Sequence, residues 1–223
     1  MPGIPKFTTA IFDLDGLLID SERVIMREWL RVTDMMGDPL TETEYVPVIG
    51  LAAPESDAHL IARLGSVRFA EASDRVNAAL TSTDGPTVFQ SKAGAHDILA
   101  RMHALGVPCG VASSTATAEV ERRLRAVNLR DYFRVVVGGD KVARGKPDPA
   151  LYLRATELLA SAPAQCLAFE DSENGVKAAV AAGVEVVLVP DIKPPTTQMR
   201  RDAFIELASL EDAIPRLQEW FGH

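Results

Sequence analysis

The sequence predicts an α/β fold with a doubly wound parallel sheet and an inserted domain that is made only of helices. Three observations support this prediction. Short apolar runs alternate with helical segments along the chain, a pattern typical of parallel strands that are covered on both faces. One long stretch near the N-terminus has helical periodicity and no convincing strand. Polar residues that can carry chemistry follow several of the apolar runs.

The strands are predicted at five short runs rich in β-branched and aromatic residues. They cover residues 8–13 (TTAIFD), 107–112 (VPCGVA), 133–137 (FRVVV), 165–170 (QCLAFE) and 185–189 (EVVLV). Because these runs are almost continuously apolar, we expect a buried, Rossmann-like sheet with helices on both faces.

Helices are predicted between these strands. Between residues 92 and 106, apolar side chains recur at helical spacing, and Gly106 supplies a C-terminal cap. The segments with a similar pattern are 116–127, 148–160 and 172–182. A helix that connects two parallel strands of one sheet makes a right-handed crossover, so we expect a doubly wound arrangement.

One connection is far longer than the others. The strand at 8–13 is followed by a helix that begins only near Lys92, whereas an ordinary βα connection has about 2–6 residues. We therefore expect a catalytic core of residues 1–19 and 84–223 and an inserted helical domain of residues 20–83. The hinges would be the segments GLLIDS and TSTDGPTVFQSKAG, of which the second has the composition of a linker.

Composition narrows the classes of partner. The formal net charge is −8 over 223 residues, which argues against binding of nucleic acid and of anionic membrane surfaces. No apolar run approaches the roughly 18 residues of a spanning helix, and the first residues lack the apolar core of a signal peptide. We expect a cytoplasmic monomer, with Cys109 and Cys166 as buried thiols rather than a disulfide.

Polar residues gather where the predicted strands end. In a doubly wound sheet, ligands bind beyond the carboxyl ends of the strands, so these residues are candidates for one site. In chain order they are Asp13, Asp15, Ser113, Ser114, Lys146, Glu170 and Asp171.

The residue types indicate a phosphate bound together with a metal ion. Several carboxylates at one edge would repel one another, and Mg²⁺ removes this problem because it prefers oxygen ligands and shares them with phosphate. Asp13 and Asp15 are two positions apart in an extended segment and point the same way, so they can share one metal or one substrate. Lys146, the Ser113 hydroxyl and the N–H groups that begin the helix after residue 114 would hold the phosphate.

Each motif alone also has a purely structural explanation. Asp and Gly favour turns and often end strands, Ser113 and Ser114 could cap a helix, and Lys146 could be a surface lysine. The segment GKPDP resembles part of a nucleotide-binding P-loop, but Pro147 stands where that loop needs Ser or Thr. Four such signals in one order, each after a strand, favour a common site.

Together the four motifs resemble those of the haloacid dehalogenase superfamily, within it the phosphatases and phosphomutases with a helical cap after the first strand. The motifs are DLDGLLIDSE, the VASST that ends the second strand, the lysine of GKPDP, and the acidic pair of FEDSENG. The resemblance covers residues 8–190. It implies that the inserted helical domain is a cap that closes over the site.

The resemblance also implies a role for each candidate. Asp13 would be the nucleophile that forms an aspartyl-phosphate, and Asp15 the general acid and then the general base. Mg²⁺ would be held by Asp13, the backbone carbonyl of Asp15 and Asp171, with Glu170 either a further ligand or a partner behind the ligands. Lys146, Ser113 and the N–H of Ser114 would bind the phosphate.

These implications lead to one main expectation and two alternatives. We expect a Mg²⁺-dependent phosphatase that hydrolyses a small phosphate monoester, such as a sugar phosphate or a related metabolite. The first alternative is a sugar phosphomutase similar to β-phosphoglucomutase, although such mutases use a histidine where this sequence has Ile25 and an arginine where it has Ala53. The second is a catalytically silent binding or regulatory protein. The segment VIGLAAPES, residues 48–56, is the candidate specificity loop.

Overall fold

The computed structural model describes residues 6–51, 53–81 and 89–222. The chain divides into two compact units: unit 1 comprises residues 1–19 and 91–223, and unit 2 comprises residues 20–90. The boundary predicted between residues 83 and 84 lies outside the described residues.

The described part of unit 1 is built around a six-stranded sheet in which every pair of neighbours is parallel. The strand order is β3-β2-β1-β4-β5-β6, so the predicted doubly wound fold is confirmed. The strands are β1 (Thr9–Phe12), β2 (Cys109–Ala112), β3 (Val135–Val137), β4 (Cys166–Glu170), β5 (Glu185–Leu188) and β6 (Ile205–Glu206). The last one is a two-residue edge strand that the sequence pattern did not indicate.

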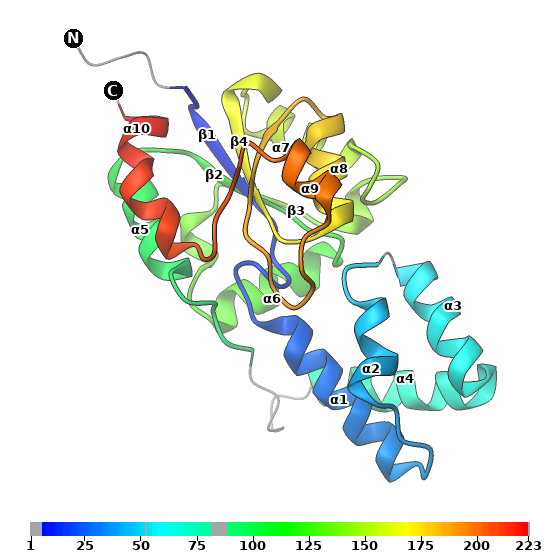
Figure 1. Ribbon diagram of the computed structural model, residues 1–223. Helices are drawn as coiled ribbons and strands as arrows, with labels where there is room; N and C mark the ends of the chain where they lie inside the picture. Colours follow the sequence, from blue (N-terminus) through cyan, green and yellow to red (C-terminus); the bar gives the residue numbers. More distant parts are fainter. Residues whose placement is uncertain (1–5, 52, 82–88, 223) are drawn as a thin grey trace. The chain divides into compact units, whose positions relative to one another are not determined.

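Helices cover both faces of this sheet (Figure 1). On one face lie α7, α8 and α9, and α5 and α10 lie on the other. The helices of unit 1 are α5 (Ala95–Ala104), α6 (Thr117–Ala126), α7 (Ala150–Leu158), α8 (Glu173–Ala181), α9 (Thr197–Asp202) and α10 (Leu217–Phe221). Short 3₁₀ segments cover Arg130–Tyr132, Gly139–Lys141, Pro163–Gln165 and Glu211–Arg216.

The packing around β1 and β4 determines where the site lies. On one face, Ile11 and Ala168 belong to a buried apolar cluster with residues of α7 and α8. On these same two strands, the rings of Phe12 and Phe169 stack with their centroids 4.6 Å apart, and the two residues are register partners. The next residues, Asp13 directly after β1 and Glu170 at the end of β4, therefore lie side by side at the carboxyl edge of the sheet. The strand order changes direction between β1 and β4, which is where an open α/β sheet forms its crevice.

Unit 2 is helical in all its regular described structure. It contains α1 (Ser21–Met35), α2 (Glu42–Tyr45), a 3₁₀ segment (Val46–Val48), α3 (Ala53–Leu64) and α4 (Ser66–Thr81). Helix α1 packs on α4, with Trp29 stacked on Phe69 at a centroid distance of 5.8 Å. This packing buries the apolar side of an amphipathic α1, which is how a short helix is stabilised in a protein.

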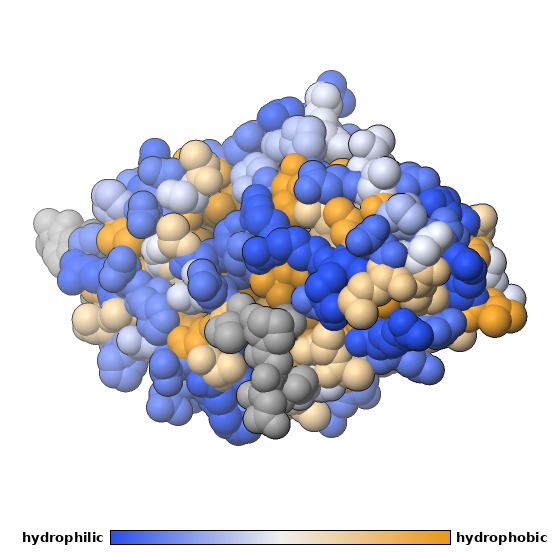
Figure 2. Space-filling model, turned by 90° about the horizontal axis from the view of Figure 1, so that it is seen from below, coloured by the Kyte–Doolittle hydropathy of each residue, from blue (hydrophilic) through white to orange (hydrophobic). Residues whose placement is uncertain are grey.

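The described helices include none that is long and apolar enough to cross a membrane. On the face of the molecule in Figure 2, hydrophobic residues are interrupted by hydrophilic ones rather than gathered into one continuous area. Cys109 and Cys166 are both buried free thiols, as the apolar context of the two cysteines predicts.

Candidate active site

Asp13 follows β1 directly and is almost completely buried, with 6% of the residue exposed. Its backbone N–H donates to the carbonyl of Phe169 at 3.0 Å, which ties the residue to the end of β4. The Lys146 ammonium donates a hydrogen bond to its Oδ1. The same ammonium lies 2.5 Å from Oε1 of Glu170, so one buried cation joins two carboxylates that come from neighbouring strands.

Burial and the neighbouring charges of opposite sign shift the pKa values of Asp13 and Lys146 in opposite directions. Burial raises the pKa of the Asp13 carboxyl well above its ordinary value, and the nearby Lys146 ammonium works in the opposite direction. For Lys146, burial alone would lower the pKa, but the carboxylates of Asp13 and Glu170 outweigh it and raise the pKa above the ordinary value. Lys146 is therefore a permanent positive charge beside Asp13 at neutral pH.

Glu170 is enclosed on all sides. Its Oε1 accepts from Lys146 and from the hydroxyl of Tyr152 at 2.7 Å. Its Oε2 accepts from the N–H groups of Asp171 at 3.1 Å and Ser172 at 3.3 Å, and from the Ser172 hydroxyl at 3.1 Å. A side chain on Gly175 would overlap this carboxylate, because a Cβ there would lie 1.9 Å from Oε1. Glu170 thus holds Lys146 in place, and both its oxygens already accept several hydrogen bonds.

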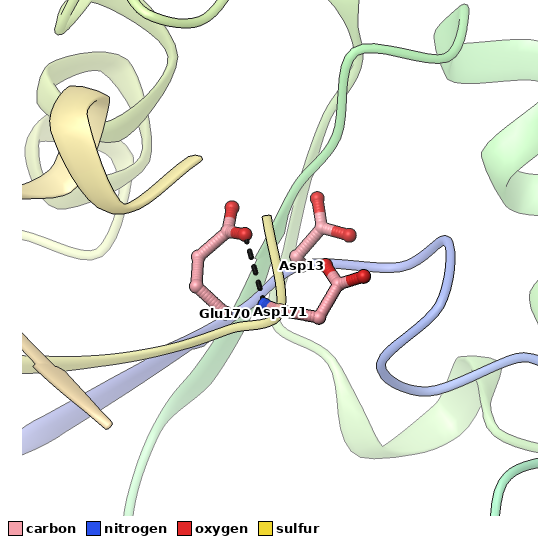
Figure 3. Close-up of side chains that lie close together, drawn as sticks. All are labelled: Asp13, Glu170 and Asp171. Carbon is pink, nitrogen blue, oxygen red and sulfur yellow. Dashed lines mark hydrogen bonds between the residues drawn. The ribbon is translucent and has the colours of Figure 1, made fainter. Parts of the chain in front are cut away.

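Three carboxylates form a cluster that could hold a metal ion. One oxygen each of Asp13, Glu170 and Asp171 lies within 4.8 Å of the others. In Figure 3, the carboxylates of Asp13 and Asp171 lie next to each other, and the Glu170 carboxylate is hydrogen-bonded to the backbone N of Asp171. Carboxylate oxygens are the donors that hard divalent cations prefer. The composition of the cluster therefore fits Mg²⁺ or a similar ion.

The glycine behind the two aspartates has a structural reason. Gly16 has a φ of +84°, in the left-handed region that residues with a side chain rarely adopt. A Cβ at this position would also lie 2.4 Å from Oδ2 of Asp171. The D-x-D-G motif thus brings its backbone against Asp171, directly after β4, where only a glycine fits.

Asp15 lies outside this carboxylate cluster and has its own partners. Oδ1 accepts from Nη1 of Arg123 at 2.5 Å, and Oδ2 accepts from the hydroxyl of Thr115 at 2.8 Å. The Ser113 hydroxyl lies 3.5 Å from the same Oδ2. Arg123 was not a candidate in the sequence, because it is one of three arginines in ERRLR and only its depth distinguishes it. Thr115 could have been found, since it follows the two predicted serines.

The segment after β2 places Ser113 and Ser114 differently. Ser113 is buried, its N–H donates to the carbonyl of Val137 at 3.0 Å, and its hydroxyl accepts from the N–H of Thr115 at 3.1 Å. Ser114 is exposed. Its carbonyl lies so close to Gly139 that a Cβ there would come within 2.4 Å. Gly138 and Gly139, after β3, therefore allow the backbone of the segment that follows β2 to come close to them.

The structure brings the predicted residues together in two neighbouring groups. Asp13, Lys146 and Glu170, which are buried, form the first group with the partly exposed Asp171. Asp15 and Ser113 form the second, with Arg123 and Thr115 added. A buried carboxylate beside a fixed lysine and a candidate metal site, at the switch point of a parallel sheet, can attack an electrophilic centre that carries negative charge. These features fit a hydrolase or transferase of phosphoryl groups.

Comparison with known proteins gives the family. The family model of haloacid dehalogenase-like hydrolases matches residues 10–189, and the chain belongs to this family. The predicted resemblance is confirmed.

Two relatives and one solved structure illustrate the similarity. Phosphorylated carbohydrates phosphatase of Thermotoga maritima is 33% identical over 183 residues, which cover 78% of this chain and 81% of the relative. Hexitol phosphatase A of Escherichia coli is 31% identical over 203 residues, 90% of each chain. The crystal structure of a HAD family hydrolase from Deinococcus radiodurans, with bound phosphate and sodium, is 29% identical, has a TM-score of 0.79 and covers 97% of both chains. These relatives confirm the predicted class of enzyme, a phosphoric monoester hydrolase.

Proposed function

We propose that this protein is a Mg²⁺-dependent phosphatase that hydrolyses a small phosphate monoester, a sugar phosphate or related metabolite, through an aspartyl-phosphate on Asp13. The observation that carries the proposal is the placement of Asp13, which is buried, hydrogen-bonded to Lys146 and adjacent to Asp171. The names of the relatives, which are phosphatases of phosphorylated carbohydrates and hexitols, support the class of substrate.

The residues present fit the metal. Asp13 and Asp171 would hold Mg²⁺ through their carboxylates and Asp15 through its backbone carbonyl, and the bound ion would neutralise phosphate charge and align the attack. We assign Glu170 to the support of Lys146 rather than to the metal, because its oxygens already accept hydrogen bonds from Lys146, Tyr152 and Ser172.

The chain's own residues account for two successive displacements. In the first, an Asp13 oxygen forms a bond to phosphorus while the bond to the leaving oxygen breaks, and Asp15 donates the proton that the leaving alkoxide needs. In the second, Asp15 removes a proton from water, the water oxygen bonds to phosphorus, and the Asp13–phosphorus bond breaks to regenerate the carboxylate. Lys146, Ser113 and the N–H of Ser114 would offset the charge on the phosphate oxygens.

Unit 2 would serve as the cap. A domain inserted after β1 can exclude water during phosphoryl transfer and contribute contacts that select the substrate. The segment of residues 48–56 remains the candidate for that selection, but it is not a loop throughout, because residues 53–56 belong to the first turn of α3. Residue 52 lies outside the described residues.

Release of inorganic phosphate from p-nitrophenyl phosphate, with and without Mg²⁺, tests the proposal. We expect activity that EDTA removes and added Mg²⁺ restores. A folded protein that releases no phosphate from this ester or from a panel of phosphorylated metabolites would favour the alternative of a silent binding or regulatory protein. The same panel would identify the preferred substrate.

A further inference from the structure

Arg123 is a buried cation that reaches Asp15 from a helix of the core. It lies on α6, and 7% of the residue is exposed. Its Nη1 donates to Oδ1 of Asp15 at 2.5 Å, and its Nε donates to Oε1 of Glu119 at 2.7 Å. Glu119 is one turn earlier on the same helix. The guanidinium therefore joins a helical carboxylate to the carboxylate of Asp15.

The second oxygen of Asp15 also accepts a hydrogen bond. The Thr115 hydroxyl donates to Oδ2 at 2.8 Å, and Thr115 stands between β2 and α6. The donor on Oδ1 thus comes from α6 and the donor on Oδ2 from the segment that links β2 to α6. With Arg123 on Oδ1, and Thr115 and the more distant Ser113 hydroxyl on Oδ2, the carboxylate is held against rotation about its own axis.

A buried guanidinium needs such partners. Taking an arginine out of water has a large cost in free energy unless the charge is paired and hydrogen-bonded. The planar guanidinium presents donors in fixed directions, so Nε and Nη1 can serve two carboxylates at once, which a lysine ammonium would do with less defined geometry. Burial of Arg123 is thus coupled to the position of Asp15.

We propose that Arg123 is a positioning residue that, with Glu119 behind it and Thr115 beside it, sets the orientation in which Asp15 meets the leaving oxygen of the substrate. This inference rests on the proposed function, in which Asp15 protonates that oxygen. A displacement of about 1 Å of a catalytic group can lower a rate by about 100-fold. Loss of Arg123 should therefore impair the step that needs the proton and spare a step that does not.

Two esters with different leaving groups separate a step that needs the proton of Asp15 from a step that does not. p-Nitrophenolate leaves without protonation, whereas the alkoxide of glycerol 2-phosphate needs a proton. The test is to measure kcat/KM for both esters with saturating Mg²⁺ and to take the ratio of the value for the alkyl ester to the value for the aryl ester. This ratio does not depend on the fraction of folded enzyme. The variants are Arg123→Met, Arg123→Lys, Glu119→Gln and Asp15→Asn.

The matched control is Arg125→Gln. Arg125 lies on the same helix, 67% of its side chain is exposed, and it pairs with Glu121 at 2.8 Å. We expect the ratio of this variant to equal that of the wild type.

We expect Asp15→Asn to lower the ratio of alkyl to aryl ester by about 100-fold or more, in the range typical of general acid catalysis. Arg123→Met should lower it by about tenfold or more, and Arg123→Lys and Glu119→Gln by less. If Asp15→Asn lowers the ratio and neither Arg123→Met nor Glu119→Gln does, Arg123 is structural and the inference is wrong. If Asp15→Asn leaves the ratio unchanged, the role of Asp15 fails first, and with it the proposed mechanism.

Discussion

Lys146 and Glu170 form a buried ion pair in which Nζ lies 2.5 Å from Oε1, with 4% of the lysine side chain and none of the glutamate side chain exposed. The desolvation cost of two buried charges is offset only when their remaining hydrogen-bonding groups are satisfied. Here Lys146 also donates to Asp13, and Glu170 accepts from Tyr152 and from the start of α8. The pair thus fixes a positive charge beside the proposed nucleophile.

Glu170→Gln should therefore destabilise the protein. One oxygen of Glu170 accepts from Lys146 and the other from two N–H groups and a hydroxyl, so an amide NH₂ would face donors in either orientation. We expect the free energy of unfolding to fall by about 3 kcal/mol, the loss typical of a broken buried ion pair, as measured in urea. Glu157→Gln is the control: Glu157 pairs with Arg154, 68% of its side chain is exposed, and its loss should cost less than about 1 kcal/mol.

Glu170→Gln also tests whether Glu170 supports Lys146 or binds the metal. Asp171→Asn should weaken the affinity for Mg²⁺, so that half-maximal activity needs a higher Mg²⁺ concentration, without a comparable loss of stability. Glu170→Gln should retain the wild-type Mg²⁺ midpoint in its folded fraction. Equal shifts of that midpoint in both variants would show that Glu170 is a ligand.

Asp13→Asn should abolish turnover and leave the protein folded, because an amide cannot attack phosphorus. Burial raises the pKa of Asp13 above its ordinary 3.8, so the folded state binds this proton more tightly than the unfolded state. The contribution of Asp13 to stability therefore falls as the pH rises above about 3.8. We expect the variant, at pH 7 in EDTA, to unfold at the same temperature as the wild type or higher. More than a few per cent of wild-type turnover, once deamidation has been excluded by mass spectrometry, would contradict the role of Asp13.

A second pH dependence belongs to unit 2. Hydrogen bonds from Arg63, and from the backbone and hydroxyl of Thr41, lower the pKa of Glu44 from about 4.5 to about 2. The stabilisation is complete above the unfolded pKa and is lost as the pH falls from about 4.5 to 2. Urea unfolding of unit 2, followed by Trp29 fluorescence in a Trp220→Phe background, should therefore show a smaller loss of stability in acid for Glu44→Gln. The exposed Glu42→Gln on the same helix is the control, and it should follow the parent protein.

Predictions from the sequence agree with the structure where local residue types determine the result. They miss features that depend on the burial of a side chain or on contacts between residues far apart in the chain. The five strands with continuous apolar runs were predictable, whereas β6 has two residues and depends on pairing with β5. The position of Asp13 follows from the end of a strand in a parallel sheet, whereas Lys146 lies in the connection between β3 and α7, beyond the 3₁₀ segment Gly139–Lys141. Arg123 could not be singled out, because Arg122 and Arg125 beside it have the same chemistry and only Arg123 is buried. The enclosure of Glu170 depends on Tyr152, which is 18 residues away.

The final acceptor of the phosphoryl group distinguishes a phosphatase from a phosphomutase. A phosphomutase must keep the phospho-aspartate from water until a second sugar hydroxyl arrives, and by resemblance it uses a histidine on the first cap helix and an arginine in the cap loop. The corresponding positions here are Ile25 on α1 and Ala53 at the start of α3. An isoleucine has no proton to exchange and an alanine has no charge to hold a dianion. A shift of the alignment by one residue would not restore the group, since residues 49–56 contain no Arg or Lys.

We therefore expect water to be the acceptor. The enzyme is incubated with glucose 1-phosphate, Mg²⁺ and a hexose bisphosphate primer, and glucose 6-phosphate and free phosphate are followed in the same samples. If either sugar phosphate is a substrate, free phosphate should accumulate and glucose 6-phosphate should not form from glucose 1-phosphate. Asp13→Asn should produce neither. Replacement of Ile25 by His should leave this outcome unchanged, because the arginine position would still lack a charge. Rapid formation of the isomer with little free phosphate would show that the enzyme is a mutase and that a group other than these two positions protects the phospho-aspartate.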